Sequence, residues 1–116
     1  MGDAAQDTDR LEESLATRDQ RHFHLRLFVV GATPSSQRAI VTLAEMCRTE
    51  LEGRHELEVI DVYQHPDRAV AEQIVATPTL IRIEPLPSVR LVGDLSDRRR
   101  VMLGLDLVLA GDPGPS

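Results

Sequence analysis

The feature that most constrains the fold is a strand, helix and strand pattern over residues 25–62. Leu25–Gly31 (LRLFVVG) is apolar almost throughout and rich in Val, which predicts a strand buried on both faces. An amphipathic stretch follows, with Ser35 or Ser36 as its N-cap and Gly53 as its stop, and predicts a helix. Glu56–Val62 (ELEVIDV) predicts a second strand. Because a crossover helix joins them, the two strands should pair in parallel.

The remainder of the chain predicts one more helix, two strands and a last helix. Pro66 suits a helix start, and the apolar stripe of that helix would consist of Val70, Ile74 and Val75. Strands are expected from Thr79 and at residues 90–95, before a helix at 98–110 capped by Ser96 or Asp97. The order β-α-β-α-β-β-α is the thioredoxin-like order, so we predict a thioredoxin-like α/β fold.

The length of 116 residues fits one domain. Residues 1–22 are mostly polar and charged, and any helix they form would be marginal alone. We therefore expect a flexible extension at 1–22, a folded domain at 23–110 and a flexible tail at 111–116.

Composition excludes several classes of partner. The net charge of −6 and the three aromatic residues argue against nucleic acid, which requires a basic surface and stacking platforms. No apolar run approaches the ~20 residues that span a bilayer, so no membrane association is expected. The acidic N-terminus lacks the apolar core of a signal peptide, which predicts a cytoplasmic protein.

The chain lacks the residues that catalysis in this fold requires. A thioredoxin-like enzyme carries its thiol at the turn after the first strand, where the helix N-terminus lowers the thiol pKa. That turn, residues 31–36, holds no cysteine, and the single Cys47 is expected in the core. The histidines have no metal-ligand spacing, and no nucleophile and base can be paired. We expect no enzyme activity, no cofactor and no metal.

Two single residues, Pro78 and Asp61, are predicted to have structural roles. Pro78 opens a strand, which in this fold is usually the place of a cis-proline beside the active turn, although a plain structural turn is the alternative. Asp61 ends a strand, and we expect it to cap that strand end or to pair with an arginine.

The stretch LGLDLVLAG (103–111) fits either a strand or a helix. In a strand, Leu103, Leu105, Leu107 and Leu109 share one face. In a helix, the buried stripe is Val101, Met102, Leu105, Val108 and Leu109, whereas Leu103 and Leu107 point to the opposite side. Within that helix, Gly104 costs about 1 kcal/mol relative to Ala, and Asp106 faces the negative end of the helix dipole. Both residues therefore disfavour the helical form.

Several segments in order give the chain a family resemblance. LRLFVVGATPSSQRA, ATPTL with a following P-x-P, GDLSDR and GLDL resemble the KaiB family over residues 24–110. The resemblance implies two folds with a shared N-terminal half: a ground state that assembles into a tetramer or dimer, and a thioredoxin-like monomer. The monomer is the form that binds the ring-forming ATPase KaiC, and the last segment is a strand in the first fold and a helix in the second.

The resemblance also assigns roles to individual positions. Gly104 and Asp106 correspond to positions that control the switch, with Asp106 also at the binding surface. Three prolines correspond to those whose cis or trans state differs between the folds, namely Pro78, Pro85 and Pro87. Arg38 corresponds to a KaiC-facing position.

Two acidic residues depart from the family pattern. Many clock-type members carry a small residue and a lysine where this chain has Glu56 and Glu58, so we expect a reversed local charge at the KaiC-facing surface. The leading prediction is a non-enzymatic, fold-switching regulator of a KaiC-like ATPase that competes with a histidine kinase. The alternative is a thioredoxin-like sensory domain of a histidine-kinase system.

Overall fold

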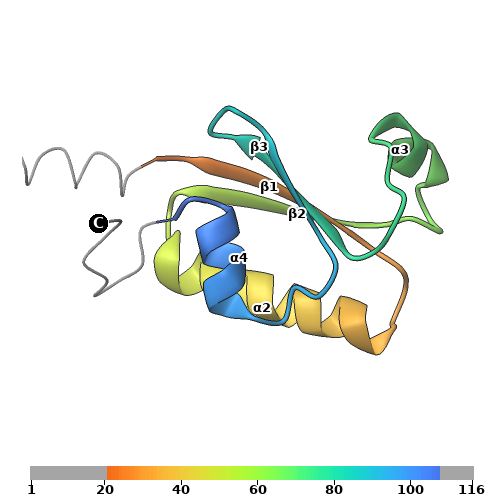
Figure 1. Ribbon diagram of the computed structural model, residues 1–116, viewed down its shortest axis with the longest axis horizontal. Coiled ribbons are helices and arrows are strands. Elements are labelled where there is room, and N and C mark those ends of the chain that lie inside the picture. The colour runs from red at the N-terminus through yellow and green to blue at the C-terminus, as the bar shows by residue number, and fades with distance from the viewer. Residues whose placement is uncertain (1–20, 108–116) are drawn as a thin grey trace, which may run out of the picture.

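A computed structural model describes residues 21–107, and these residues form a four-stranded sheet with helices on both faces (Figure 1). The elements are β1 (Phe23–Val29), α2 (Pro34–Glu50), β2 (His55–Asp61), α3 (Pro66–Ala71), β3 (Thr79–Glu84), β4 (Val89–Val92) and α4 (Arg98–Gly104). The predicted tail at 111–116, most of the predicted extension at 1–22, and Val108 and Leu109 lie outside the described residues.

The strand order is β2-β1-β3-β4. The β1 and β2 strands pair in parallel, with Leu25 opposite Leu57, which confirms the pairing predicted from the connecting helix. The β3 strand then runs antiparallel to both β1 and β4. This element order and topology make the fold thioredoxin-like, as the sequence predicts.

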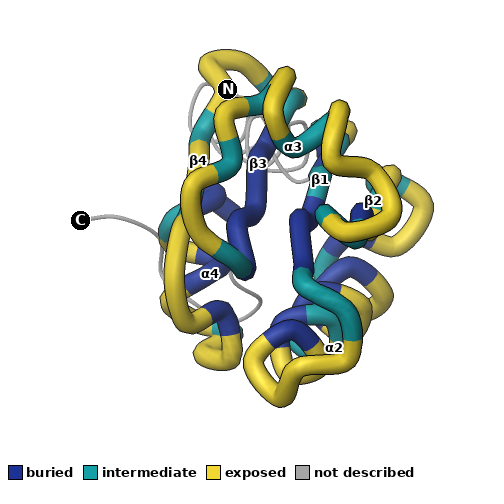
Figure 2. The backbone as a smooth tube through the Cα atoms, turned by 90° about the vertical axis from the view of Figure 1, so that its right-hand side faces the viewer, coloured by how far each residue is buried: buried dark blue, intermediate teal, exposed yellow. Residues whose placement is uncertain are grey.

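The main core lies between the sheet and the pair α2 and α4, which cover the same face (Figures 1 and 2). Alternate β1 residues point into it, and Leu25 and Leu27 are fully buried there against Leu43 and Met46 of α2. Burying each such side chain stabilises the fold by roughly 1.5–3 kcal/mol. A smaller cluster on the opposite face is built on Phe28, as expected from the period of two along a strand.

The start of α2 differs from the prediction. Thr33, not Ser35 or Ser36, is the N-cap, and its hydroxyl oxygen accepts a hydrogen bond from the Ser36 backbone N–H at 3.3 Å. Pro34 takes the first helical position, where its missing N–H is harmless. The Ser36 hydroxyl is buried and contacts the end of β1, accepting from the Val30 N–H at 3.1 Å.

The α3 helix is shorter than predicted and carries no buried stripe. Val70 and Val75 are 78% and 92% exposed, so two of the three predicted stripe residues face solvent. Only Ile74, beyond the end of the helix, packs against the smaller apolar cluster. The prediction treated 66–75 as one helix, but the chain leaves the helix after Ala71 and Gln73 has a φ of 55°.

Candidate functional site

The turn between β1 and α2 has no thiol, and the cis-proline beside it is present. Thr77–Pro78 is cis, as the sequence suggests for this fold, and the peptide bonds before Pro85 and Pro87 are cis too. Cys47 is 1% exposed, as predicted, and burial raises the pKa of its thiol to about 11. A protonated, covered thiol is a poor nucleophile.

The α4 helix ends earlier in the sequence than predicted. The helix ends at Gly104 with Leu105 as its C-cap, and the two N–H groups after Leu105 fold back onto it: Asp106 donates to the Leu103 carbonyl at 3.2 Å and Leu107 to the Met102 carbonyl at 3.0 Å. This pair of bonds is a Schellman motif. It returns Leu107 to the core, where it is 8% exposed, and this corrects the prediction that Leu107 points to the opposite side. Val101, Met102 and Leu105 are buried as predicted.

Asp106 disfavours the helical form of the last segment for a different reason from the one predicted. It lies beyond the helix rather than in its last turn, and its φ is 59°, a left-handed conformation that suits glycine best. For a residue with a side chain, this conformation costs roughly 1–2 kcal/mol. Arg21 lies against it, with Nη2 donating to the Asp106 carbonyl at 2.8 Å and Nη1 3.6 Å from its carboxylate.

Gly104 allows close packing between α4 and β4. A Cβ atom added there would lie 2.7 Å from Cδ2 and 2.9 Å from Cδ1 of Leu91. Those distances are too short for carbon atoms in contact, so a larger residue must displace the Leu91 side chain. Gly104 therefore has a packing role in addition to its low helix propensity, and the sequence alone does not reveal it.

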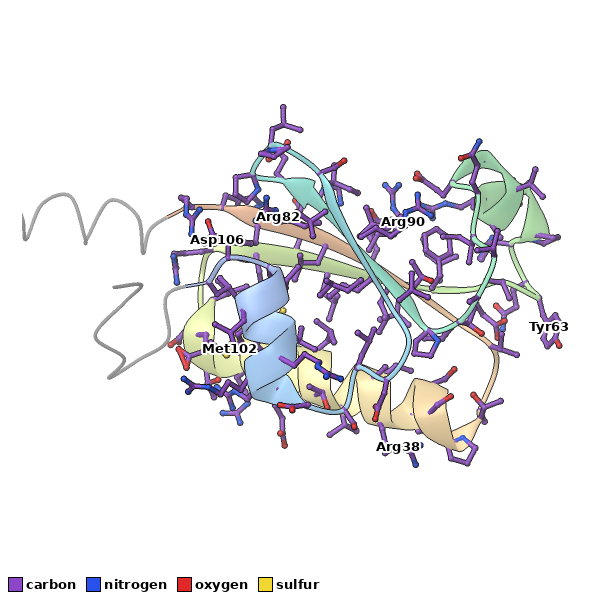
Figure 3. The ribbon with its side chains drawn as sticks, viewed as in Figure 1. Arg38, Tyr63, Arg82, Arg90, Met102 and Asp106 are labelled. Carbon is purple, nitrogen blue, oxygen red and sulfur yellow. The ribbon has the colours of Figure 1, made fainter. Side chains whose placement is uncertain are left out.

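Arg82 is a site residue that the sequence analysis missed. It lies on β3 at 4% exposure, and its side chain reaches two backbone carbonyls (Figure 3). Nη1 donates to the Leu105 carbonyl at 2.6 Å and Nη2 to the Pro87 carbonyl at 2.7 Å. Burial lowers the pKa of the guanidinium, and the charge of Asp106 opposes that shift. The available signal was a charged residue in the middle of the apolar strand TLIRIE.

Glu58 is at the centre of an ion cluster on the other face of the sheet. His24 Nε2 and Arg26 Nη2 lie 2.8 and 3.2 Å from its Oε1, and Arg68 Nη2 lies 3.0 Å from its Oε2. Arg26 also contacts Glu72 at 2.6 Å, which ties the residue that caps the end of α3 to β1. The charge of Glu58 is therefore compensated within this chain by Arg26 and Arg68, whereas the role of both acids at a KaiC-facing surface stays a prediction.

The remaining predicted residues lie apart. Glu56 neighbours the ion cluster, with its carboxylate 3.9 Å from His24 and its side chain 65% exposed. Arg38 is exposed on the outer side of α2, and Figure 3 places it well away from Asp106 at the end of α4. These residues do not form one pocket, and any shared role would be on an extended surface.

Arg90 on β4 binds the two residues that follow α3. Its Nη1 and Nη2 donate to the carbonyls of Gln73 and Glu72 at 3.2 and 2.7 Å. Arg90 is exposed and faces away from α4, because its neighbour Leu91 faces α4.

Asp61 lies at the end of β2, and its side chain accepts a hydrogen bond from the Tyr63 N–H at 2.9 Å, which confirms the predicted capping role.

Residues 21–107 contain neither a metal-binding cluster nor a membrane-spanning helix. This part of the chain holds no group of three His, Cys, Asp or Glu side chains placed to hold a metal ion. Nor does any helix within it have the length and apolar character needed to cross a bilayer.

The ion cluster predicts a specific acid sensitivity. Hydrogen bonds from His24 first, and then from Arg68 and Arg26, lower the pKa of Glu58 from 4.5 to about 2. A depressed folded-state pKa gives stability that is complete above the ordinary pKa and is lost as the pH falls toward 2. We expect Glu58→Gln to flatten the fall in stability between pH 4.5 and 2, measured by urea unfolding at each pH. Glu56→Gln is the matched control and should leave the slope unchanged; an equal effect of both variants would contradict the cluster's role.

The topology, the buried thiol and the cis-proline without a neighbouring cysteine define the class: a thioredoxin-like protein with no thiol at the turn between β1 and α2. Within that class, the chain belongs to the KaiB family, because the KaiB domain model matches residues 26–107. The circadian clock oscillator protein KaiB of Prochlorococcus marinus is 48% identical over 89 residues, which are 77% of this chain and 76% of that protein.

Solved structures agree with the thioredoxin-like fold. The N-terminal domain of Synechococcus elongatus SasA is 28% identical with a TM-score of 0.58, covering 74% of this chain and 85% of that one. The Fasciola hepatica thioredoxin is 16% identical with a TM-score of 0.61, covering 81% and 88%, and shows likeness of fold alone. The resemblance proposed from the sequence motifs is thus confirmed, and the protein is a member of the KaiB circadian clock protein family.

Proposed function

We propose that this protein is a non-enzymatic, cytoplasmic regulator that binds a KaiC-type ring ATPase in the thioredoxin-like form. The observation that carries the proposal is the helical α4 of a KaiB family chain, packed on the sheet through Val101, Met102 and Leu105. In the family resemblance, the helical last segment is the form that binds KaiC.

A second fold of the same chain is part of the proposal. Asp106 in a left-handed conformation and the low helix propensity of Gly104 both limit the stability of α4, and the Leu91 side chain leaves little room for a larger residue at position 104. We propose that they keep the helical form in balance with a ground state in which the last segment is a strand and the chain assembles into a tetramer or dimer. Binding to the ATPase would then be reduced by the fraction of chains in the ground state.

The proposed binding surface includes Arg38 on α2, Glu56 on β2 and Asp106 after α4. Since Glu58 is already paired with two arginines, Arg26 and Arg68, Glu56 is the more exposed acid that could face a partner. We propose that the cognate ATPase presents a basic residue opposite Glu56. A Glu56→Lys variant should then lose binding that Glu58→Gln retains.

The test is formation of the complex with the KaiC-like ATPase of the same organism, followed over hours by gel filtration. Asp106→Gly and Asp106→Ala both remove the carboxylate and its contact with Arg21, but only glycine relieves the left-handed conformation. A relief of about 1 kcal/mol raises the helical population about fivefold while that form is the minority. We expect Asp106→Gly to form the complex faster than Asp106→Ala by about that factor.

Each outcome of this test is informative. A slow wild type and a faster Asp106→Gly variant would support binding through a minority helical form. Complex formation at once by all three proteins would retain the KaiC-type partner but contradict the balance of two folds. No complex with any of them, all being folded, would overturn the proposed function.

A second candidate is a thioredoxin-like interaction domain of a histidine-kinase system. It is favoured by the similarity to the N-terminal domain of SasA in the same fold. Such a domain would stay in the thioredoxin-like form at all times and would bind the ATPase without delay. Under the leading proposal, in contrast, the chain competes with a histidine kinase for the ring, so adding such a kinase domain should displace it.

A further inference from the structure

The guanidinium of Arg82 contacts two segments of the chain, the end of α4 and the loop between β3 and β4. Arg82 Nη1 reaches the carbonyl of Leu105, which caps the end of α4, and Nη2 reaches the carbonyl of Pro87 in the loop between β3 and β4. Leu105 is 23 residues from Arg82 in the sequence and Pro87 only 5. Figure 3 shows Arg82 beside Asp106, at the end of the sheet where α4 finishes.

The register explains why Arg82 points toward α4. On β1, its partner is Leu25, a core residue, and on β4 it is Val89. Arg90, one residue after Val89, pairs with Ile81 and faces the α3 side instead. The two arginines thus hold different helices from opposite faces of the same pair of strands.

The chemistry suits this contact. The last carbonyls of a helix have no partner inside the helix, so a buried one requires a donor from elsewhere. A planar guanidinium donates two hydrogen bonds at once, and a charged donor forms stronger bonds than a neutral one. Arg82 Nε is buried without a hydrogen-bond partner, so its two carbonyl contacts must offset most of the cost of burying the charge.

We propose that Arg82 is a positioning residue that couples α4 to the β3–β4 loop, so that both segments open and close together. Losing either carbonyl leaves a buried charge with a single partner, which makes opening of one segment promote opening of the other. In relation to partner binding, this inference rests on the proposed function, because it makes Arg82 a determinant of how much of the chain has a helical α4.

Native-state hydrogen exchange on the full chain tests the coupling without any partner. We compare Arg82→Met, Arg82→Lys and the control Arg90→Met, following the amides of α4, β4, α3 and β2. In Arg82→Met we expect about tenfold or faster exchange in both α4 and β4, as befits loss of a charge-assisted hydrogen bond, with β2 unchanged. Lysine keeps the charge but lacks the two-pronged donor, so Arg82→Lys should also speed exchange in both α4 and β4, by a smaller factor than Arg82→Met. Arg90→Met should affect α3 alone.

Three results would overturn the proposal: faster exchange in α4 alone in Arg82→Met, equal acceleration across β2 and the rest of the sheet, or no change. If Arg82→Met does not fold, the Arg82→Lys pattern decides the same question. These readouts are independent of KaiC-type binding, so the coupling can fail while the proposed function stands, and the reverse.

Discussion

Leu105→Ala is expected to lower the free energy of unfolding by about 2–5 kcal/mol, whereas Leu103→Ala should change it by about 0.5 kcal/mol or less. Leu105 is fully buried in the core, and Leu103 on the same helix is 60% exposed. Truncating the first leaves a cavity between α4 and the sheet, while truncating the second removes only solvent-facing atoms. Urea unfolding of the two variants and the wild type measures both values.

The comparison is sharp because the two residues are the same type and two positions apart. In a strand, residues two apart share one face, so Leu103 and Leu105 would be buried or exposed together. In the helical α4 they lie on different sides. The ratio of the two stability losses therefore reports which form of the last segment dominates in solution.

Similar losses for both variants would contradict a dominant helical α4 and would favour the strand form of the segment. Unequal losses at every protein concentration would support a chain that stays thioredoxin-like. Unequal losses in dilute solution that become similar at high concentration would indicate assembly of the ground state, because association favours the oligomeric form by mass action.

Periodicity explains which parts of the fold could be predicted. The continuous apolar run at residues 25–31 and the helical spacing of apolar residues after it are two clearly different patterns. They predict a buried strand and a crossover helix, so the parallel pairing of β1 with β2 could be predicted from sequence alone. The buried stripe of Val101, Met102 and Leu105 was also predicted, because a helix of any length from Arg98 places these three on one side.

The errors occurred where tertiary contacts or single backbone angles decide. Leu107 is buried because the Schellman turn after Gly104 reverses the chain, and no period extends through such a turn. Val70 and Val75 are exposed because α3 ends after one and a half turns on a charged part of the sheet. Apolar residues at helical spacing predicted burial there, but they do not specify a face to pack against.

The roles of the candidate site residues stay predictions, and the contacts that these residues make could not be predicted from the sequence. The ion pairs of Glu58 are not visible in the sequence, because its partners His24, Arg26 and Arg68 come from β1 and α3. Arg82 was missed for another reason: its two partners are backbone carbonyls, which any residue type could supply. Backbone acceptors leave no trace in a sequence.

Gly104→Ala is expected to stabilise α4 only when Leu91 is shortened as well. Alanine gains about 1 kcal/mol in helix propensity over glycine, but its Cβ meets the Leu91 methyl groups, and overpacking of this kind costs about 1–3 kcal/mol. In the wild-type background the two effects oppose each other, so Gly104→Ala should be neutral or destabilising. In Leu91→Ala, the clash is absent and the same change should stabilise by about 1 kcal/mol.

A double-mutant cycle by urea unfolding measures this coupling, and we expect it to be about 1–3 kcal/mol. Val92→Ala is the matched control, since Val92 is the next residue on β4, half exposed and on the opposite face from Leu91, and should show no coupling to Gly104. Additive effects of Gly104→Ala and Leu91→Ala would mean that Gly104 limits α4 through helix propensity alone. In that case Gly104→Ala by itself should speed complex formation with the ATPase; with coupling, the acceleration should require Leu91→Ala.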